Sequence, residues 1–514
     1  MVAFAGYELP EQTATALRAR PYAGLTLFRH WNVQSPAQLR ALTAAIQAAA
    51  SAGARPLLIA TDQEGGQLNA LGDGPTEFAG AMALGAVGDD ELAQRVGAAT
   101  ARELLALGVN VDYAPVCDLA SNPENPALGI RCFGDEPVAV GRLAAATVRG
   151  LQSAGVAATV KHFPGLGNAP ADTHHGPAAV ASSRAELEER ELVPFRAAIA
   201  AGARLAMAGH LAVPALTGDD TLPASLSERV LRGVLRDDIG FQGLTITDAL
   251  DMAAVASGAG VADPVLAAVS AGEDLLLGTP LVPLLDALPD DVGDAAPGRR
   301  LAALRRWLAS FDQPPLEMVG CAEHQALALE LARRSVTLVR DDDGLLPLRP
   351  APDGRVLVVQ PQPADLTPAD TSSTVTPTLA DSIRRRHART DELITAAEPA
   401  EADLAAVRSR ATEYDAIIVG SVAAHLQPAQ AALVRAVLDT GRPTITVALR
   451  TPWDLLAYPG ARTHVCTYGA LAPSMEMLAA ALFGQRGFEG HLPVRLGQLY
   501  PRGHGLRSGQ AVGA

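Results

Sequence analysis

Residues 157–165 read AATVKHFPG, an apolar run that stops at a lysine, a histidine and a Phe-Pro-Gly turn. A strand that is covered on both faces reads as a continuous apolar run, because neither of its faces meets water. Proline and glycine then end the strand and begin a loop. The stretch therefore predicts a buried parallel strand with ionisable side chains at its carboxyl end.

The same pattern recurs through the first 300 residues, where short apolar runs alternate with helical segments rich in Ala and Leu. Strands separated by helices are typical of a parallel sheet, and eight of them favour a (β/α)8 TIM-type barrel. We predict an α/β protein whose catalytic barrel domain spans residues 1–312. The predicted strands are Val2–Ala5, Leu25–Phe28, Leu57–Ala60, Val109–Tyr113, Ala157–Lys161, Leu205–Ala208, Leu244–Thr247 and Asp274–Leu277.

A linker and a second domain are expected over residues 313–514. From about His324 onwards strands again alternate with helices, over fewer than 200 residues, which favours a C-terminal α/β sandwich. The stretch 361–379 is rich in Pro, Thr and Ser and predicts a long loop. The strands predicted in this domain are Ser335–Val339, Val356–Val359, Ala416–Val419, Thr444–Ala448 and His464–Thr467.

The net charge of the chain is −15, which disfavours nucleic acid and anionic membranes as partners. No apolar run reaches the roughly 18 residues that span a bilayer, and Met1–Pro10 lacks the features of a secretory signal. The four cysteines lack the paired spacing of a zinc site and are expected to be reduced thiols. We expect a cytoplasmic monomer or homodimer without metal or organic cofactor.

Polar groups directly follow four of the predicted barrel strands. The third strand leads into Asp62-Gln63-Glu64-Gly65-Gly66, the fifth ends in Lys161-His162, the sixth leads to His210 and the seventh to Asp248. The carboxyl ends of barrel strands meet at one end of the barrel, where barrel enzymes build their active sites. The sequence therefore predicts an active site at this end.

Asp248 is the best candidate nucleophile. It lies in LTITDALDM (residues 244–252), where a strand ends and the carboxylate would point into the barrel mouth. An aspartate at this position could equally serve as the N-cap of the following helix. The local sequence leaves both interpretations open.

A second candidate element is Asp172-Thr173-His174, on a loop that follows the fifth strand. An aspartate two residues before a histidine can accept its Nδ1–H, which fixes the tautomer and stabilises the protonated ring. His174 could then donate a proton to a substrate. The alternatives are an incidental surface loop, or a pairing that involves His175 instead.

These motifs, together with Arg131-Cys132-Phe133-Gly134, occur in the order seen in glycoside hydrolase family 3. The chain resembles the β-N-acetylglucosaminidase (NagZ-like) branch of that family in its two-domain form. The resemblance covers residues 20–280 and, more loosely, residues 344–348 and 490–494. In that branch an Asp-Ser/Thr-His pair on a barrel loop serves as the acid/base.

The resemblance implies a retaining, exo-acting β-N-acetylglucosaminidase that acts on peptidoglycan fragments or chito-oligosaccharides. It makes Asp248 the nucleophile and Asp172/His174 the acid/base dyad. The substrate-binding residues that it implies are Asp62, Arg131, Lys161, His162 and His210.

Other interpretations remain for several of these positions. Arg131 and Lys161 could form structural ion pairs with Asp118 or Glu64, and His210 could be a buried, hydrogen-bonded histidine. At the level of the whole protein, the alternatives are a phosphorylase with phosphate as acceptor, then a β-glucosidase, and last a non-catalytic sugar-binding protein. Gln67 stands where many relatives have arginine, a departure that bears on the preferred aglycone and not on the reaction type.

Overall fold

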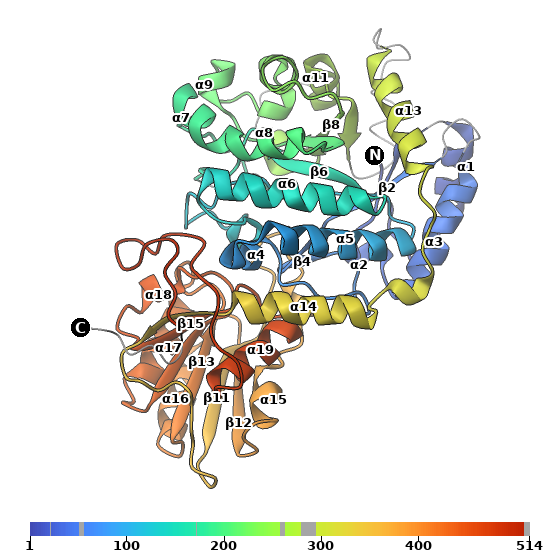
Figure 1. Cartoon of the computed structure of the whole chain (residues 1–514). Coiled ribbons are helices and arrows are strands. Elements are labelled where there is room, and N and C mark those ends of the chain that lie inside the picture. Colours follow the sequence, from blue (N-terminus) through green and yellow to red (C-terminus); the bar gives the residue numbers. More distant parts are fainter. Residues whose placement is uncertain (21, 51–55, 171, 257–262, 279–294, 508–514) are drawn as a thin grey trace.

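The computed structural model describes residues 1–20, 22–50, 56–170, 172–256, 263–278 and 295–507 of the 514-residue chain. It shows two α/β domains, a barrel and a smaller sheet domain, which the long helix α14 (Ala322–Ser335) joins along one side (Figure 1). Among the described residues, no helix is both long enough and apolar enough to cross a membrane.

Seven parallel strands form the barrel in the order β1-β2-β5-β6-β7-β8-β9. The chain start closes the gap between the first and the last strand. Val2 forms a parallel bridge with Leu25, while the Met1 nitrogen donates to the Leu276 carbonyl (2.7 Å) and the Met1 carbonyl accepts from the Gly278 N–H (3.3 Å). The strand bounds are β1 Gly24–Thr26, β2 Leu58–Thr61, β5 Val111–Asp112, β6 Ala157–Phe163, β7 Leu205–Ala208, β8 Leu244–Ala249 and β9 Leu275–Leu277.

The barrel fold predicted from the sequence is thus confirmed, with one difference at its first strand. The predicted strand Val2–Ala5 is reduced to the single bridge at Val2. Asn32 explains why the chain turns away there, because its side-chain amide donates to the carbonyls of Phe4 and Gly6 (2.9 and 3.1 Å). Those backbone groups are therefore satisfied by a side chain instead of a neighbouring strand.

Helices surround the barrel, and their ends follow ordinary capping chemistry. Ser35, Asp89 and Glu136 accept backbone N–H groups in the first turns of α3, α5 and α6. The helix α13 packs across the amino ends of the strands, where Leu304 and Leu308 join the apolar interior of the barrel. The helix bounds are α1 Glu11–Ala19, α2 Arg29–Asn32, α3 Pro36–Ala49, α4 Ala81–Val87, α5 Asp90–Ala106, α6 Pro137–Ser153, α7 Arg184–Glu186, α8 Leu192–Ala200, α9 Pro214–Thr217, η5 Arg229–Asp238, α10 Ala253–Ala256, α11 Pro264–Ala271 and α13 Ala296–Leu308.

The second domain is a six-stranded sheet in the order β10-β15-β14-β13-β11-β12, in which β10 alone runs antiparallel to its neighbour. Alternate residues of each strand face opposite helical layers, with α14, α15 and α19 on one face and α16 and α17 on the other. The bounds are β10 Thr337–Asp341, β11 Val356–Pro361, α15 Leu379–Arg384, β12 Thr390–Thr395, α16 Glu401–Ala411, β13 Ala416–Ser421, α17 Pro428–Leu438, β14 Thr444–Ala448, α18 Asp454–Ala457, β15 Thr463–Cys466 and α19 Ala472–Leu482.

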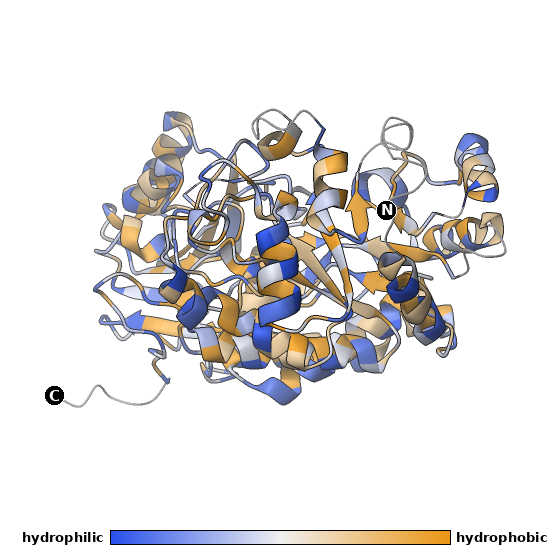
Figure 2. Ribbon diagram, turned by 90° about the horizontal axis from the view of Figure 1, so that it is seen from above, coloured by the Kyte–Doolittle hydropathy of each residue, from blue (hydrophilic) through white to orange (hydrophobic). Residues whose placement is uncertain are grey.

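The sequence prediction for this domain lacked one strand, the edge strand β12. It reads TDELIT, and its middle residues are only partly covered, so it has no continuous apolar run. An edge strand with solvated faces does not need one. In the view from above, apolar strands occupy the middle of the molecule, and the surrounding helices carry both apolar and hydrophilic residues (Figure 2).

Candidate active site

A pocket of about 160 Å³ opens at the carboxyl ends of the barrel strands. The strand ends bring ionisable side chains together there, as expected for this end of a barrel. Six of the eight residues singled out from the sequence line the pocket: Asp62, Arg131, Lys161, His162, His174 and Asp248. Asp172 lies behind His174, and His210 is not among the lining residues.

Asp248 is the penultimate residue of β8 and is surrounded by imidazole rings. Burial alone would raise the pKa of its carboxyl, but His162, His210 and His174 together hold that pKa below its usual value. The carboxylate form that a nucleophile needs is thereby favoured. The alternative role as a helix N-cap does not fit, because α10 begins five residues later, at Ala253.

Asp172 and His174 form a close hydrogen-bonded pair on the turn after β6. His174 Nδ1–H donates to Asp172 Oδ1 (2.6 Å), and the same oxygen accepts the His174 backbone N–H (2.9 Å). Burial raises the pKa of Asp172, but its bonds to His174 outweigh this and lower it overall. Since Asp172 occupies Nδ1, the ring nitrogen left for a substrate is Nε2. The neighbouring His175 is exposed to solvent.

A buried network of charges forms one wall of the pocket. Lys161 Nζ lies 2.6 Å from both Asp62 Oδ1 and Glu64 Oε1. Arg131 donates two hydrogen bonds of 2.8 Å to the Glu64 carboxylate. Burial raises the pKa of Glu64, yet Arg131 and Lys161 bring it down to about 2. The structural ion pair with Glu64 is therefore present for both cations, although both also line the pocket. Asp62, with 26% of its side chain exposed, is the acid of this network that remains open to a ligand.

His162 is oriented by Asp118, a residue that the sequence analysis considered only as a partner for Arg131 or Lys161. His162 Nδ1–H donates to Asp118 Oδ2 (2.7 Å), while Asp118 Oδ1 accepts the Leu166 N–H (2.6 Å). Nε2 of His162 is consequently left on the side of Arg131, 3.4 Å from its Nη2. Asp118 could not be recognised from the sequence, because it stands five residues beyond the predicted strand Val109–Tyr113 and in no recognised motif.

His210 supports the end of β8 from behind. Its ring is 1% exposed, with Nδ1 2.7 Å from Ser225 Oγ and Nε2 2.9 Å from the Ala249 carbonyl. A carbonyl can only accept, so Nε2 carries the hydrogen. Burial lowers the pKa of this ring, which favours the neutral form. The position matches the buried, hydrogen-bonded histidine considered as the alternative.

The second domain supplies another wall of the pocket, through the loop 361–379. Residues 368–371 of this loop line the pocket beside Asp62. Thr371 donates to the Gln67 carbonyl from its N–H (2.8 Å), and Thr371 Oγ1 accepts the Asn69 N–H (3.0 Å). Asp370 forms a fully buried ion pair with Arg450 (2.6 Å). The sequence predicted this loop but gave no signal for its place in the site, which depends on contacts across about 300 residues of chain.

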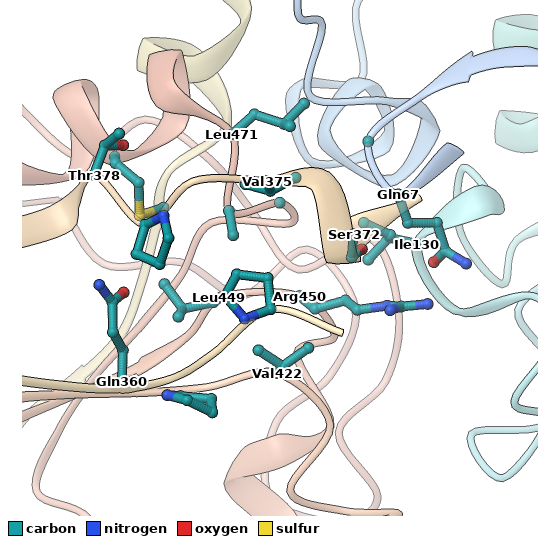
Figure 3. Close-up of a pocket in the computed structure, with 17 residues that line it drawn as sticks. Gln67, Ile130, Gln360, Ser372, Val375, Thr378, Val422, Leu449, Arg450 and Leu471 are labelled. Atoms are coloured by element: carbon teal, nitrogen blue, oxygen red, sulfur yellow. The ribbon is translucent and has the colours of Figure 1, made fainter. Parts of the chain in front are cut away.

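Other residues of the same loop line a second, mainly apolar cavity (Figure 3). This cavity lies at the carboxyl ends of β11, β13 and β14, between the two domains. Gln67 borders it from the barrel side, and its Oε1 is buried without a hydrogen-bond partner among the described residues. Residues of this loop therefore line both the candidate pocket and the second cavity.

Two family models match the chain. Residues 3–295 match the glycosyl hydrolase family 3 N terminal domain, and residues 336–502 match the C-terminal domain of the same family.

No cluster of three or more His, Cys, Asp or Glu residues arranged for a metal ion occurs in the described part of the chain.

Individual relatives cover nearly the whole chain. A family 3 β-N-acetylglucosaminidase structure from Paenibacillus sp. str. FPU-7 superposes with a TM-score of 0.89 and 33% identity, over 96% of this chain and 97% of that one. The β-hexosaminidase A of Pseudoalteromonas piscicida is 29% identical over 95% of this chain and 91% of its own length. A β-N-acetylglucosaminidase/β-glucosidase of Cellulomonas fimi is 30% identical over 89% of this chain and 87% of its own.

Proposed function

The chain belongs to glycosyl hydrolase family 3 and is a glycosidase, and on that premise we propose that it is a retaining, exo-acting β-N-acetylglucosaminidase. The observation that carries the proposal is the Asp172–His174 pair on a barrel loop, with His174 and Asp248 lining one pocket. The names of the Paenibacillus and Pseudoalteromonas relatives support the same substrate class.

In the first step, Asp248 attacks the anomeric carbon of the terminal sugar. The bond to the leaving oxygen breaks, and His174 Nε2–H gives that oxygen its proton, so that a covalent glycosyl–Asp248 ester forms. Asp172 stabilises the imidazolium before the transfer and holds the ring in place through Nδ1.

In the second step, a water molecule attacks the same carbon from the face that the leaving group vacated. Neutral His174 takes its proton at Nε2, and the Asp248 carboxylate leaves, which restores both groups to their starting states. Two inversions at one carbon retain the β configuration of the released sugar.

The charged wall of the pocket would bind the sugar hydroxyls. Asp62 can accept hydrogen bonds from two hydroxyls, and Lys161 holds its carboxylate in position. His162 offers Nε2 from a ring that Asp118 has fixed. Because Glu64 and Asp62 together balance the charges of Arg131 and Lys161, the wall presents directed hydrogen bonds more than net charge.

Phosphorolysis is the second candidate. The acid/base is an imidazole, so its unprotonated form is neutral and would repel an incoming phosphate less than a carboxylate would. Attack by phosphate in place of water would yield a sugar 1-phosphate. We place hydrolysis first, with peptidoglycan fragments or chito-oligosaccharides as substrates in the cytoplasm.

The test is to follow p-nitrophenyl β-N-acetylglucosaminide and the matching glucoside, with and without phosphate, by proton NMR. Release of β-anomeric N-acetylglucosamine as the first product, also in phosphate, is the expected result. Accumulation of β-linked sugar 1-phosphate would instead identify a phosphorylase that shares the double-displacement mechanism. Cleavage of the glucoside alone would overturn the assignment of the substrate.

A further inference from the structure

A groove of about 490 Å³ lies at the end of the barrel opposite the catalytic pocket. It is bordered by the residues that lead into β7 and β8, by the loop 240–243 and by α13. None of the residues assigned to catalysis or sugar binding lines it.

Three arginines line this groove: Arg204 just before β7, and Arg299 and Arg300 in the first turn of α13. Arg300 donates to one oxygen of Asp274 (2.7 Å), and the other oxygen is taken by Arg236 (2.7 Å). Among the described residues, no carboxylate lies within ion-pair distance of Arg204 or Arg299. Two guanidinium groups thus have no counter-ion within the described residues.

The neighbouring Glu273 does not supply the missing charge. It is 5% exposed, and burial raises its pKa well above the usual value, which favours the uncharged acid. Counted over the described residues, the groove is therefore a local excess of positive charge in a chain whose net charge is −15. Such a concentration of one sign attracts an ion of the opposite sign.

Arg204 is also held in a fixed orientation. Its guanidinium carbon lies 3.8 Å from the centre of the Trp307 ring, and its Nε is buried without a hydrogen-bond partner among the described residues. Burial lowers the pKa of this group, with no carboxylate to raise it again. A stacked guanidinium loses little conformational freedom when it binds an oxyanion through its planar donors.

We propose that this groove is a binding site for a small phosphate monoester, with the phosphate held by Arg204 and Arg299. A bare phosphate would fill only part of the volume, and the Gln242 amide with the apolar Phe241 and Leu304 is available to the remainder of the ligand. The proposal is independent of every catalytic assignment above.

The experiment is isothermal titration of the whole protein with glucose 6-phosphate, inorganic phosphate and glucose, at ionic strength held constant with NaCl. Wild-type protein should bind glucose 6-phosphate more tightly than inorganic phosphate and show no binding of glucose at this site. Arg204→Gln and Arg299→Gln should each weaken glucose 6-phosphate binding by about tenfold or more, because each removes charge-assisted hydrogen bonds.

Two comparisons make the result decisive. Arg306→Gln changes an exposed arginine of the same helix outside the groove and should leave the affinity unchanged. Loss of the Arg204–Trp307 contact in Arg204→Gln could lower the melting temperature. Arg299 is exposed, so Arg299→Gln keeps the fold and tests the site independently of stability. If wild type, Arg204→Gln and Arg299→Gln bind glucose 6-phosphate with equal affinity, the groove is not its binding site. If inorganic phosphate binds as tightly as glucose 6-phosphate, the site does not select a phosphate monoester.

Discussion

At the carboxyl ends of the barrel strands, Lys161 and Arg131 are both held by Glu64, whereas at the amino ends Arg204 and Arg299 have no carboxylate partner among the described residues. The paired cations cannot attract an anion strongly, but they keep Asp62 and the pocket wall in a fixed arrangement. Arg204 and Arg299 leave their positive charge available to a ligand, because no carboxylate among the described residues pairs with them. A neutral sugar needs directed hydrogen bonds, and an anion needs net charge, so the two ends are suited to different ligands.

The largest effect should come from Asp248→Asn. An amide of nearly the same shape removes the nucleophile, and we expect kcat to fall by roughly 10⁴-fold while N-acetylglucosamine still binds. Release of p-nitrophenol measures kcat, and calorimetry measures the binding of N-acetylglucosamine. Asp251→Asn, three residues along the chain and exposed, is the matched control and should keep near wild-type turnover. If Asp251→Asn were slow while Asp248→Asn stayed active, the nucleophile would be Asp251 and not Asp248.

Asp172→Asn should lower kcat/KM by about 10³-fold, since the imidazolium loses its negative partner and the acid/base step weakens. Protonated His174 is needed for the first step, and the variant favours that form less. The alkaline limb of the pH profile should therefore move to lower pH. His175→Ala, at the exposed neighbour, should leave both the rate and the profile in place, and a shift there would point to His175 as the acid.

Glu64→Gln should cost about 3 kcal/mol of unfolding free energy, because two buried cations lose their common partner. The folded-state pKa of Glu64 is about 2, below its ordinary 4.5. Its contribution is therefore complete above pH 4.5 and is lost as the pH falls towards 2. Urea unfolding across that window should show a flatter pH dependence in the variant than in the wild type.

The same comparison can be made at the other end of the barrel. Asp274→Asn also removes a carboxylate shared by two arginines and should destabilise the fold. It should leave KM unchanged, whereas Glu64→Gln should raise it. Equal effects on KM would mean that the two charge clusters differ only in position.

The smallest effect is expected from Thr371→Val, which removes a hydroxyl that joins the second-domain loop to Asn69. KM should rise by roughly threefold to tenfold with little change in kcat, because the wall of the pocket loosens while the catalytic groups stay in place. Thr376→Val, at an exposed position of the same loop, is the control. A fall in kcat with unchanged KM would contradict this role of the loop.

The parts of the molecule that could be predicted from the sequence are those encoded locally. Seven barrel strands are continuous apolar runs, and Lys161, His162 and Asp248 directly follow or end such runs. The roles of these residues remain predictions. Asp118, which orients His162, and residues 368–371, which line the pocket, could not be foreseen, because their positions depend on contacts between distant segments. The edge strand β12 was missed because its exposed faces leave no apolar pattern.

The contacts between Thr371 and the barrel have a consequence for the order in which the enzyme is made. A ribosome delivers the barrel before residues 368–371 exist, and domains generally fold in the order of synthesis. The nascent barrel therefore holds Asp248 and the Asp172–His174 pair in place while one wall of the pocket is still absent, and the Gln67 carbonyl and the Asn69 N–H stay open to water. A chain that stops short of the loop would have these side chains in a pocket that never closes.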